Sequence, residues 1–257
     1  MKTVDFLPYE QFAQLSNAEK DIYVSSKAAE LKVGIKNKEY VKIENASPTP
    51  QHEYVDLGLP SGTLWATCNL GAETPEETGL YFQWGDISGY TASQIGVDKT
   101  FNWANYKYCN GEYNKLTKYC SSGKTDCWDG SGEPDNKLIL DQEDDAATSH
   151  WGSNWQIPAK ADFEELTGNT TMAWDASRSG FTFTANSKEL FLPAAGYVDG
   201  VGRFSLGSYG NYWSRSLNES APYSPWKLDF YNSGSYNIYG NARCRGISVR
   251  PVRYQNI

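Results

Sequence analysis

The last fifth of the chain contains a strict alternation of apolar and polar positions. In the run Trp226-Lys227-Leu228-Asp229-Phe230-Tyr231, every second residue is apolar. Successive side chains of a β-strand point to opposite faces of a sheet. The pattern therefore predicts a strand that turns Trp226, Leu228 and Phe230 toward the core. A turn should follow at 232–235, and the chain then returns through 236–245 to a closing strand, Gly246–Val252, in which Ile247, Val249 and Val252 are core candidates.

The positions that alternate with this apolar set are rich in Tyr, Asn, Ser and Arg. Tyr supplies a large, stiff contact area, and Ser and Asn supply adaptable hydrogen bonds, which is the composition of an antibody-like binding surface. We therefore predict one outward ligand-binding face, made of Tyr223, Ser224, Lys227, Asp229, Tyr231, Tyr236, Asn237, Tyr239, Asn241, Arg243 and Arg245. The scaffold beneath it is predicted to include Trp213, Trp226, Leu228 and Phe230. An ordinary polar loop and hairpin is the alternative interpretation.

The N-terminal part of the chain has a helical pattern. Pro8 can open a helix that runs to Leu15, and Ser16 or Asn17 can cap a second one, Ala18 to Leu31,. Tyr40–Ile43 alternates like a short strand, and a Pro-rich linker follows,. We therefore expect a helical module over 1–45 for docking or oligomerisation, a linker over 46–53, and a second domain over 54–257.

The second domain is predicted to be α+β, with short antiparallel strands, long loops and two helices. The stronger helix signal is Pro158–Leu166, which has Pro at its start and acidic residues in its first turns,. A weaker helix is expected over Glu143–Ser149. Aromatic residues make up 14% of the 257 residues, with 9 Trp and 18 Tyr, so a sizeable core is expected despite the low mean hydropathy,.

The charge and the reactive residues limit the function classes. A net charge of -8 repels phosphate backbones, so we expect neither nucleic acid nor an anionic membrane as a partner,. No apolar stretch is long enough to span a bilayer. With only His52 and His150 and no phosphate-binding glycine loop, no catalytic set is apparent, and an enzyme is not expected,.

Two further groups of residues allow alternative interpretations. Asp141, Asp144 and Asp145 carry oxygen ligands that suit Ca²⁺. The favoured interpretation is an acidic cluster at a helix start, which the helix dipole stabilises, so no metal site is expected,. We expect no cofactor.

The chain has five Cys residues, and this odd number favours free thiols,. Cys109 and Cys120 are candidates for pairing in an oxidising environment.

Several long segments in the second domain resemble one known family. They include YVDLGLPSGTLWATCNLGA (54–72), GLYFQWGD (79–86), EDDAATSHWGSNWQIPAKADFEEL (143–166), ELFLPAAGYVDG (189–200), YWSRSLNES (212–220) and GISVRPV (246–252). Together they are similar to the "major paralogous domain" of gut Bacteroidetes and their phages. The resemblance covers Tyr54 to Val252 and implies a C-type-lectin-like fold. The segment 155–166 also resembles formylglycine-generating enzymes, but these need a Cys pair near the C-terminus, where Cys244 stands alone.

The tail also resembles the variable region of proteins diversified by retroelements, over about 209–252. In such systems template adenines are randomised, and an Asn codon treated in this way cannot give Lys, Glu, Gln, Met or Trp. None of these five residue types occurs between Leu228 and Ile247. The resemblance implies that the tail is one member of a variable set, in which Cys244 is a chance outcome.

These resemblances imply a binding protein that contacts a protein or glycan ligand on a bacterial surface. The chain begins with Met and has no secretory signal,, so we expect it to be made as a soluble cytoplasmic protein. This favours a phage product carried on the virion at the tail, where residues 1–45 dock or oligomerise. The alternatives are a bacterial cell-surface adhesin with a fixed site, located extracellularly, and an inert intracellular structural protein.

Overall fold

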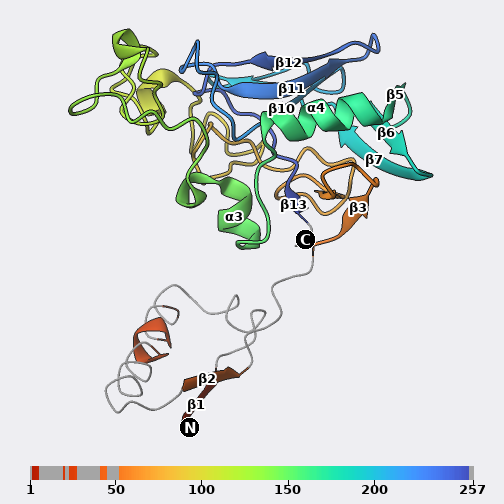
Figure 1. The fold of residues 1–257 in the computed structure, drawn as a ribbon, viewed down its shortest axis with the longest axis horizontal. Helices are drawn as coiled ribbons and strands as arrows, with labels where there is room; N and C mark the ends of the chain where they lie inside the picture. Colours follow the sequence, from red (N-terminus) through yellow and green to blue (C-terminus); the bar gives the residue numbers. More distant parts are fainter. Residues whose placement is uncertain (1, 6–19, 21–22, 28–40, 45–51, 255–257) are drawn as a thin grey trace. The chain divides into compact units, whose positions relative to one another are not determined.

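A computed structural model gives the architecture of the chain and describes residues 2–5, 20, 23–27, 41–44 and 52–254 (Figure 1). The chain divides into two compact units, Met1–Gln51 and His52–Ile257. No described helix is both long and apolar enough to cross a membrane.

The described part of the first unit contains helix and strand. Residues 20 and 23–27 are helical, within the helix expected over Ala18–Leu31. The helix expected from Pro8 to Leu15 lies outside the described residues. Strand β2 (Val41–Glu44) overlaps the strand expected at Tyr40–Ile43, and it pairs in parallel with β1 (Lys2–Asp5). The sequence pattern indicated a helical N-terminal part with no strand before Tyr40, and strand β1 corrects this. β1 pairs with β2, a partner so distant along the chain that a local pattern does not reveal it.

The second unit is α+β, as predicted, and is dominated by small antiparallel sheets (Figure 1). One sheet is ordered β13-β4-β3, a second β5-β6-β7, and a third β10-β11-β12, while β8 and β9 form a two-stranded sheet. The strands are β3 (Tyr54–Asp56), β4 (Thr63–Ala66), β5 (Thr171–Asp175), β6 (Gly180–Ala185), β7 (Lys188–Pro193), β8 (Tyr197–Asp199), β9 (Gly202–Phe204), β10 (Tyr209–Trp213), β11 (Trp226–Tyr231), β12 (Tyr236–Gly240) and β13 (Val252–Tyr254).

Two α-helices occur in the described part of this unit, residues 52–254, near the predicted places. Helix α4 (Lys160–Asn169) starts just after Pro158, and the Asp162 carboxylate accepts the backbone N–H of Ala159 at 2.6 Å. Helix α3 (Ala146–Trp151) begins three residues later than expected, because Asp145 caps it by accepting the N–H of Thr148 at 3.0 Å. Three short 3₁₀ helices, η1 (Trp103–Asn105), η2 (Thr125–Cys127) and η3 (Gln142–Asp144), lie in the loops.

The main core lies between α4 and the sheets. Phe163 and Leu166 of α4 pack in one cluster with Phe181 of β6 and with Leu228 and Phe230 of β11. The rings of Phe181 and Phe230 stack, with centroids 4.6 Å apart. The alternation in β11 therefore places Leu228 and Phe230 in the core, as predicted. This packing fixes the backbone of the sheet that carries the candidate site.

A second core cluster holds buried tryptophans whose indole N–H groups are hydrogen-bonded. Trp213 donates to the carbonyl of Phe82 at 2.8 Å, and Trp84 donates to the carbonyl of Ser214 at 2.7 Å. A buried polar group without a partner is costly, so these bonds make the rings compatible with the interior. Ile247 and Val249 of the closing segment lie in the same cluster, which confirms them as core residues.

Candidate functional site

The outer face of the β10-β11-β12 sheet contains a groove of about 360 Å³. We call it the strand groove. It is lined by Tyr209, Lys227, Asp229, Tyr231, Asn237, Tyr239, Gly240, Asn241 and Arg245. All of them except Tyr209 and Gly240 belong to the predicted ligand-binding set.

The register of the sheet explains why these side chains meet. Directly opposite residues of neighbouring strands share a face. Tyr231 of β11 stands opposite Tyr209 of β10, while Lys227 stands opposite Tyr239 of β12. Asp229 lies between Asn211 and Asn237 in one row across the three strands. On the face that points away from Leu228 and Phe230, a central row of polar side chains is therefore flanked by tyrosines on both sides.

The floor of the strand groove is a buried ion pair. Lys227 and Asp229 are 1% and 3% exposed, and the Lys227 ammonium donates to Oδ2 of Asp229. The Tyr209 hydroxyl donates to the same oxygen at 2.7 Å and accepts from Lys227 at 3.1 Å. The prediction that Lys227 and Asp229 are exposed contacts is wrong. Both side chains do lie on the outer face of the sheet. They bind each other there, and the Tyr209 side chain lies against them. Burial lowers the pKa of Lys227, although the attraction of Asp229 opposes it.

Three buried polar atoms of the same row have no hydrogen-bond partner among the described residues. They are Oδ1 of Asp229 and both side-chain polar atoms of Asn211. The large majority of buried side-chain polar atoms in proteins are hydrogen-bonded, to protein or to ordered water, so unpartnered atoms beside the groove are places where a water molecule or a ligand group can bond. Water and ligand hydroxyls can each act as donor and acceptor.

The rim of the strand groove is aromatic and polar. Tyr239 is 64% exposed and Tyr231 is 41% exposed. The Tyr231 ring stacks on Tyr209 at 4.4 Å, which holds it against the groove wall. Arg245 pairs with Asp199 at 2.9 Å and donates to the side-chain oxygen of Asn241 at 2.9 Å. The charges at the rim are therefore compensated within the protein.

The prediction of a single face is wrong for Tyr236. It stands opposite Phe230 in the register, so it projects from the core-facing side of the sheet, while its neighbour Asn237 projects into the strand groove. Tyr236 is nevertheless exposed because β12 is an edge strand. Tyr223 and Ser224 do not line the groove either: the Tyr223 ring contacts Tyr113 at 5.3 Å.

Arg243 is the clearest correction to the predicted face. Its side chain is fully buried, and its guanidinium donates to the carbonyls of Pro222 at 2.6 Å, Lys118 at 2.9 Å, and Tyr119. It also lies over the Trp84 ring at 4.9 Å. The planar guanidinium presents several donors in a fixed geometry, so one side chain ties the tail to a distant loop. Arg243 belongs to the scaffold.

The predicted scaffold residues differ in burial. Trp213, Leu228 and Phe230 are fully buried, as predicted. Trp226 is only partly buried, and its ring carries the Lys160 ammonium 4.7 Å from its centroid. Trp226 begins β11 near the sheet's end, and this position exposes one side of the ring.

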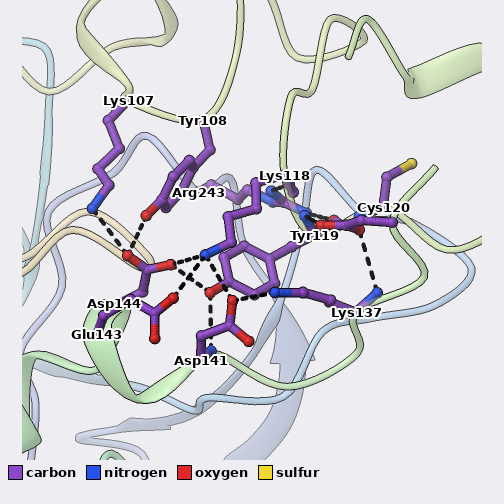
Figure 2. A network of polar contacts seen from close by, with 11 residues as sticks. Lys107, Tyr108, Lys118, Tyr119, Cys120, Lys137, Asp141, Glu143, Asp144 and Arg243 are labelled. Atoms are coloured by element: carbon purple, nitrogen blue, oxygen red, sulfur yellow. Dashed lines mark hydrogen bonds and ion pairs between the residues drawn. The ribbon is translucent and has the colours of Figure 1, made fainter. Parts of the chain in front are cut away.

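The acidic cluster predicted as a calcium alternative holds an ammonium group (Figure 2). Side-chain oxygens of Asp141, Glu143 and Asp144 lie within 4.8 Å of one another. The Lys118 Nζ lies 2.7 Å from Asp141, 3.7 Å from Glu143 and 2.6 Å from Asp144. The predicted set is corrected in one member: Asp145 turns away, and its carboxylate accepts the backbone N–H groups of Thr148 and Ile157. Pattern analysis missed Lys118, which is distant in sequence.

Asp144 is the centre of this network (Figure 2). It also accepts from Lys107 at 3.2 Å, from the Tyr119 hydroxyl at 2.5 Å, and from the Tyr108 hydroxyl. Burial acts to raise the pKa of Asp144, but the hydrogen bonds, led by that of Lys118, outweigh it and lower the pKa to about 2. Hence the carboxylate is charged at neutral pH and is fully engaged by protein donors.

The cysteines and histidines lie apart from the strand groove. All five cysteines are free thiols, as expected from their odd number, and burial raises the pKa of Cys244 to about 12. His52 stacks on Trp151 at 3.7 Å, and the His150 ring bonds to the carbonyl of Ile87 at 2.8 Å. Neither histidine lines the groove.

Sequence reasoning missed Tyr209 as a groove residue. The signal was present: Tyr209, Asn211 and Trp213 alternate along β10 in the same way as the three groove-facing residues of β11.

Comparisons with models of protein families, with curated proteins and with solved structures find no match to this chain.

Proposed function

We propose that this protein is a non-enzymatic ligand-binding protein that displays a diversified surface on a C-type-lectin-like scaffold. The N-terminal module is helical in part and docks or oligomerises the protein. The protein is phage-encoded, is carried on the virion at the tail, and contacts a protein or glycan ligand on a bacterial surface. The family resemblance of residues 54–252 supplies the biological setting, and the strand groove supplies the site.

The observation that carries this proposal is the division of β11 into two faces. Leu228 and Phe230 are fully buried against α4 and β6, so the backbone is fixed from one side. Tyr231 and Tyr239 are exposed at the rim of the groove on the other side. Exposed side chains on a rigid frame can change without loss of the fold. This arrangement suits a binding surface whose contacts vary.

The same contacts restrict which positions are interchangeable. The rim residues Tyr231, Asn237 and Tyr239 have exposed side chains. Asn241 differs from them, because its side-chain oxygen accepts from the Ala242 N–H and from Arg245. Lys227, Asp229 and Arg243 are bonded into the interior. In a diversified tail, residues at the rim would therefore vary. At the three inner positions, only residues that keep the buried hydrogen bonds and ion pair would give a folded protein.

Surface capture by rim variants tests this function. The full chain is incubated with a panel of gut Bacteroidetes cells, and bound protein is measured. Tyr231→Ala combined with Tyr239→Ala should lower capture at least about tenfold, because tyrosines are frequent hot spots of binding surfaces. Tyr236→Ala is the matched control, since this tyrosine is 43% exposed on the opposite face of the same strand pair and should have no effect. Equal loss in both variants would remove the groove from the proposal.

Diversification is tested separately from binding. The neighbouring DNA should contain a reverse transcriptase and a near-copy of the segment coding for 209–252 that differs at adenines. If no such copy exists, the diversification claim falls, and the proposal becomes the alternative with a fixed site, a bacterial cell-surface adhesin or lectin-like protein. Burial of Lys227, Asp229 and Arg243 inside the tail favours that alternative at these three positions.

A further inference from the structure

The strand groove combines aromatic walls, paired charges and polar atoms in need of partners. We propose that it binds a neutral sugar residue of a glycan, without calcium. The inference rests on the proposed function and narrows it from any ligand to one chemical class.

The charges in the groove argue against an ionic ligand. Lys227 is neutralised by Asp229 in a buried pair, and Arg245 is paired with Asp199. An incoming carboxylate, phosphate or ammonium would meet no unpaired opposite charge along the lining and would lose its hydration. A neutral ligand avoids this cost.

The polar groups of the groove suit hydroxyls. Asp229 lines the groove, and its Oδ1 has no hydrogen-bond partner among the described residues. The Asn211 amide, also without a partner there, is fully buried beside Asp229 and does not line the groove. Asn237 and Asn241 add amides at the wall, which also donate and accept,. A hydroxyl is both donor and acceptor, and several hydroxyls at fixed spacing are what a sugar ring presents. Because Asp229 is only 3% exposed, a hydroxyl would reach its Oδ1 through a bridging water,.

The walls suit the apolar face of a sugar ring. Tyr231 is held in place by stacking on Tyr209, so one of its faces is left for a ligand. Tyr239, at 64% exposure, flanks the groove above Lys227. Ordered aromatic rings bury the C–H groups of a ligand at little conformational cost. A calcium-bridged mode does not fit this lining, because Asp229 is its one carboxylate and the Lys227 ammonium already binds it.

The experiment measures binding of free monosaccharides to the full chain by isothermal titration and ligand-observed NMR, in EDTA. The probes are neutral hexoses, deoxyhexoses and N-acetylhexosamines, with uronic and sialic acids as charged probes. We expect at least one neutral sugar to bind with a dissociation constant on the order of 1 mM. Tyr239→Ala should weaken it at least about fivefold, and Tyr239→Phe should retain it because the ring remains. Tyr236→Ala should leave it unchanged.

Three results would overturn the proposal: no neutral sugar binds at roughly 10 mM, a charged probe binds more tightly than every neutral one, or calcium is required. The cell-capture assay distinguishes failure of the sugar inference from failure of the proposed binding function. If the Tyr231→Ala, Tyr239→Ala variant loses capture while no sugar binds, the ligand is a protein surface: the function stands and the sugar inference falls. If that variant keeps capture, the groove is not the site.

Discussion

At the scale of single residues, burial separates contacts from scaffold in a way that residue type does not. Arg243 and Arg245 are two positions apart in the same tail. Arg243 is fully buried with three carbonyl partners, whereas Arg245 lies partly exposed at the groove rim. Both were predicted as ligand contacts because both are arginines in a Tyr- and Asn-rich segment. The difference comes from the loop 118–119, which reaches Arg243 from far away in sequence.

Arg243→Ala should therefore lower the free energy of unfolding by about 3 kcal/mol, because it leaves buried carbonyls without donors. Chemical denaturation of both proteins measures this. Arg245→Ala, which removes a partly exposed ion pair, should cost less than about 1 kcal/mol. Arg243→Lys should recover little, because an ammonium lacks the planar fork. Similar losses for the Arg243→Ala and Arg245→Ala variants would contradict the scaffold role of Arg243.

The Lys227–Asp229 pair should show strong coupling. Lys227→Met or Asp229→Leu alone leaves a buried charged group unpaired and should cost about 3 to 5 kcal/mol. Lys227→Met combined with Asp229→Leu should cost clearly less than the sum of the two single changes, because both charges are then gone. A double-mutant cycle by urea denaturation checks this. Additive losses would mean that the pair is not formed in solution.

At the scale of elements, the 3₁₀ helix η3 and the loop 107–119 are joined through charged groups. Lys118 binds Asp141 and Asp144 directly, so the acidic cluster already contains a cation of the protein (Figure 2). The Asp145 carboxylate is used as a helix cap instead. The acidic run therefore joins a loop to the start of α3.

Calcium at millimolar concentration should not raise the melting temperature of the wild type, because Lys118 occupies the centre of the cluster. Lys118→Met should lower the melting temperature, since three carboxylates then face one another. In that variant calcium should restore part of the loss by binding the freed oxygens. A calcium-dependent rise in the wild type, measured by thermal unfolding in calcium and in EDTA, would contradict this assignment.

The pH dependence of stability should depend on Asp144. Its pKa is lowered from 3.8 to about 2, so its stabilising contribution is complete above the unfolded value and is lost as the pH falls from about 4 to about 2,. Asp144→Asn lacks this contribution. The difference in unfolding free energy between wild type and Asp144→Asn should therefore shrink over that range. A constant difference would show that the carboxylate is not held charged.

The local sequence pattern predicted a strand or helix correctly where the residues of that element alone determine it. The alternation in β11 and the Pro158 start of α4 are examples. It failed where a distant partner decides. Strand β1 needs β2, the placement of Tyr236 needs the register of β12 against β11, and the burial of Arg243 needs the loop at Lys118 and Tyr119. Register and long-range hydrogen bonds are properties of the fold, and a single strand's sequence does not contain them.

At the scale of the whole second unit, a buried frame supports an exposed rim. The two core clusters hold β11 and the closing segment from one side, and the buried bonds of Lys227, Asp229 and Arg243 add inner contacts. The rim of the strand groove carries Tyr231, Asn237, Tyr239 and Asn241. Folding and binding are therefore expected to depend on different residues of one short segment.

The most direct test is a saturation library over 226–245 displayed on a cell surface and sorted twice. The first sort, with a conformation-specific antibody, selects folded protein, and the second selects binding to a bacterial cell type that captures the wild type. We expect the exposed rim positions Tyr231, Asn237 and Tyr239 to tolerate most residues in the first sort and few in the second. Lys227, Asp229 and Arg243 should be restricted already in the first sort. Rim positions that are restricted for folding, or free for binding, would contradict the account.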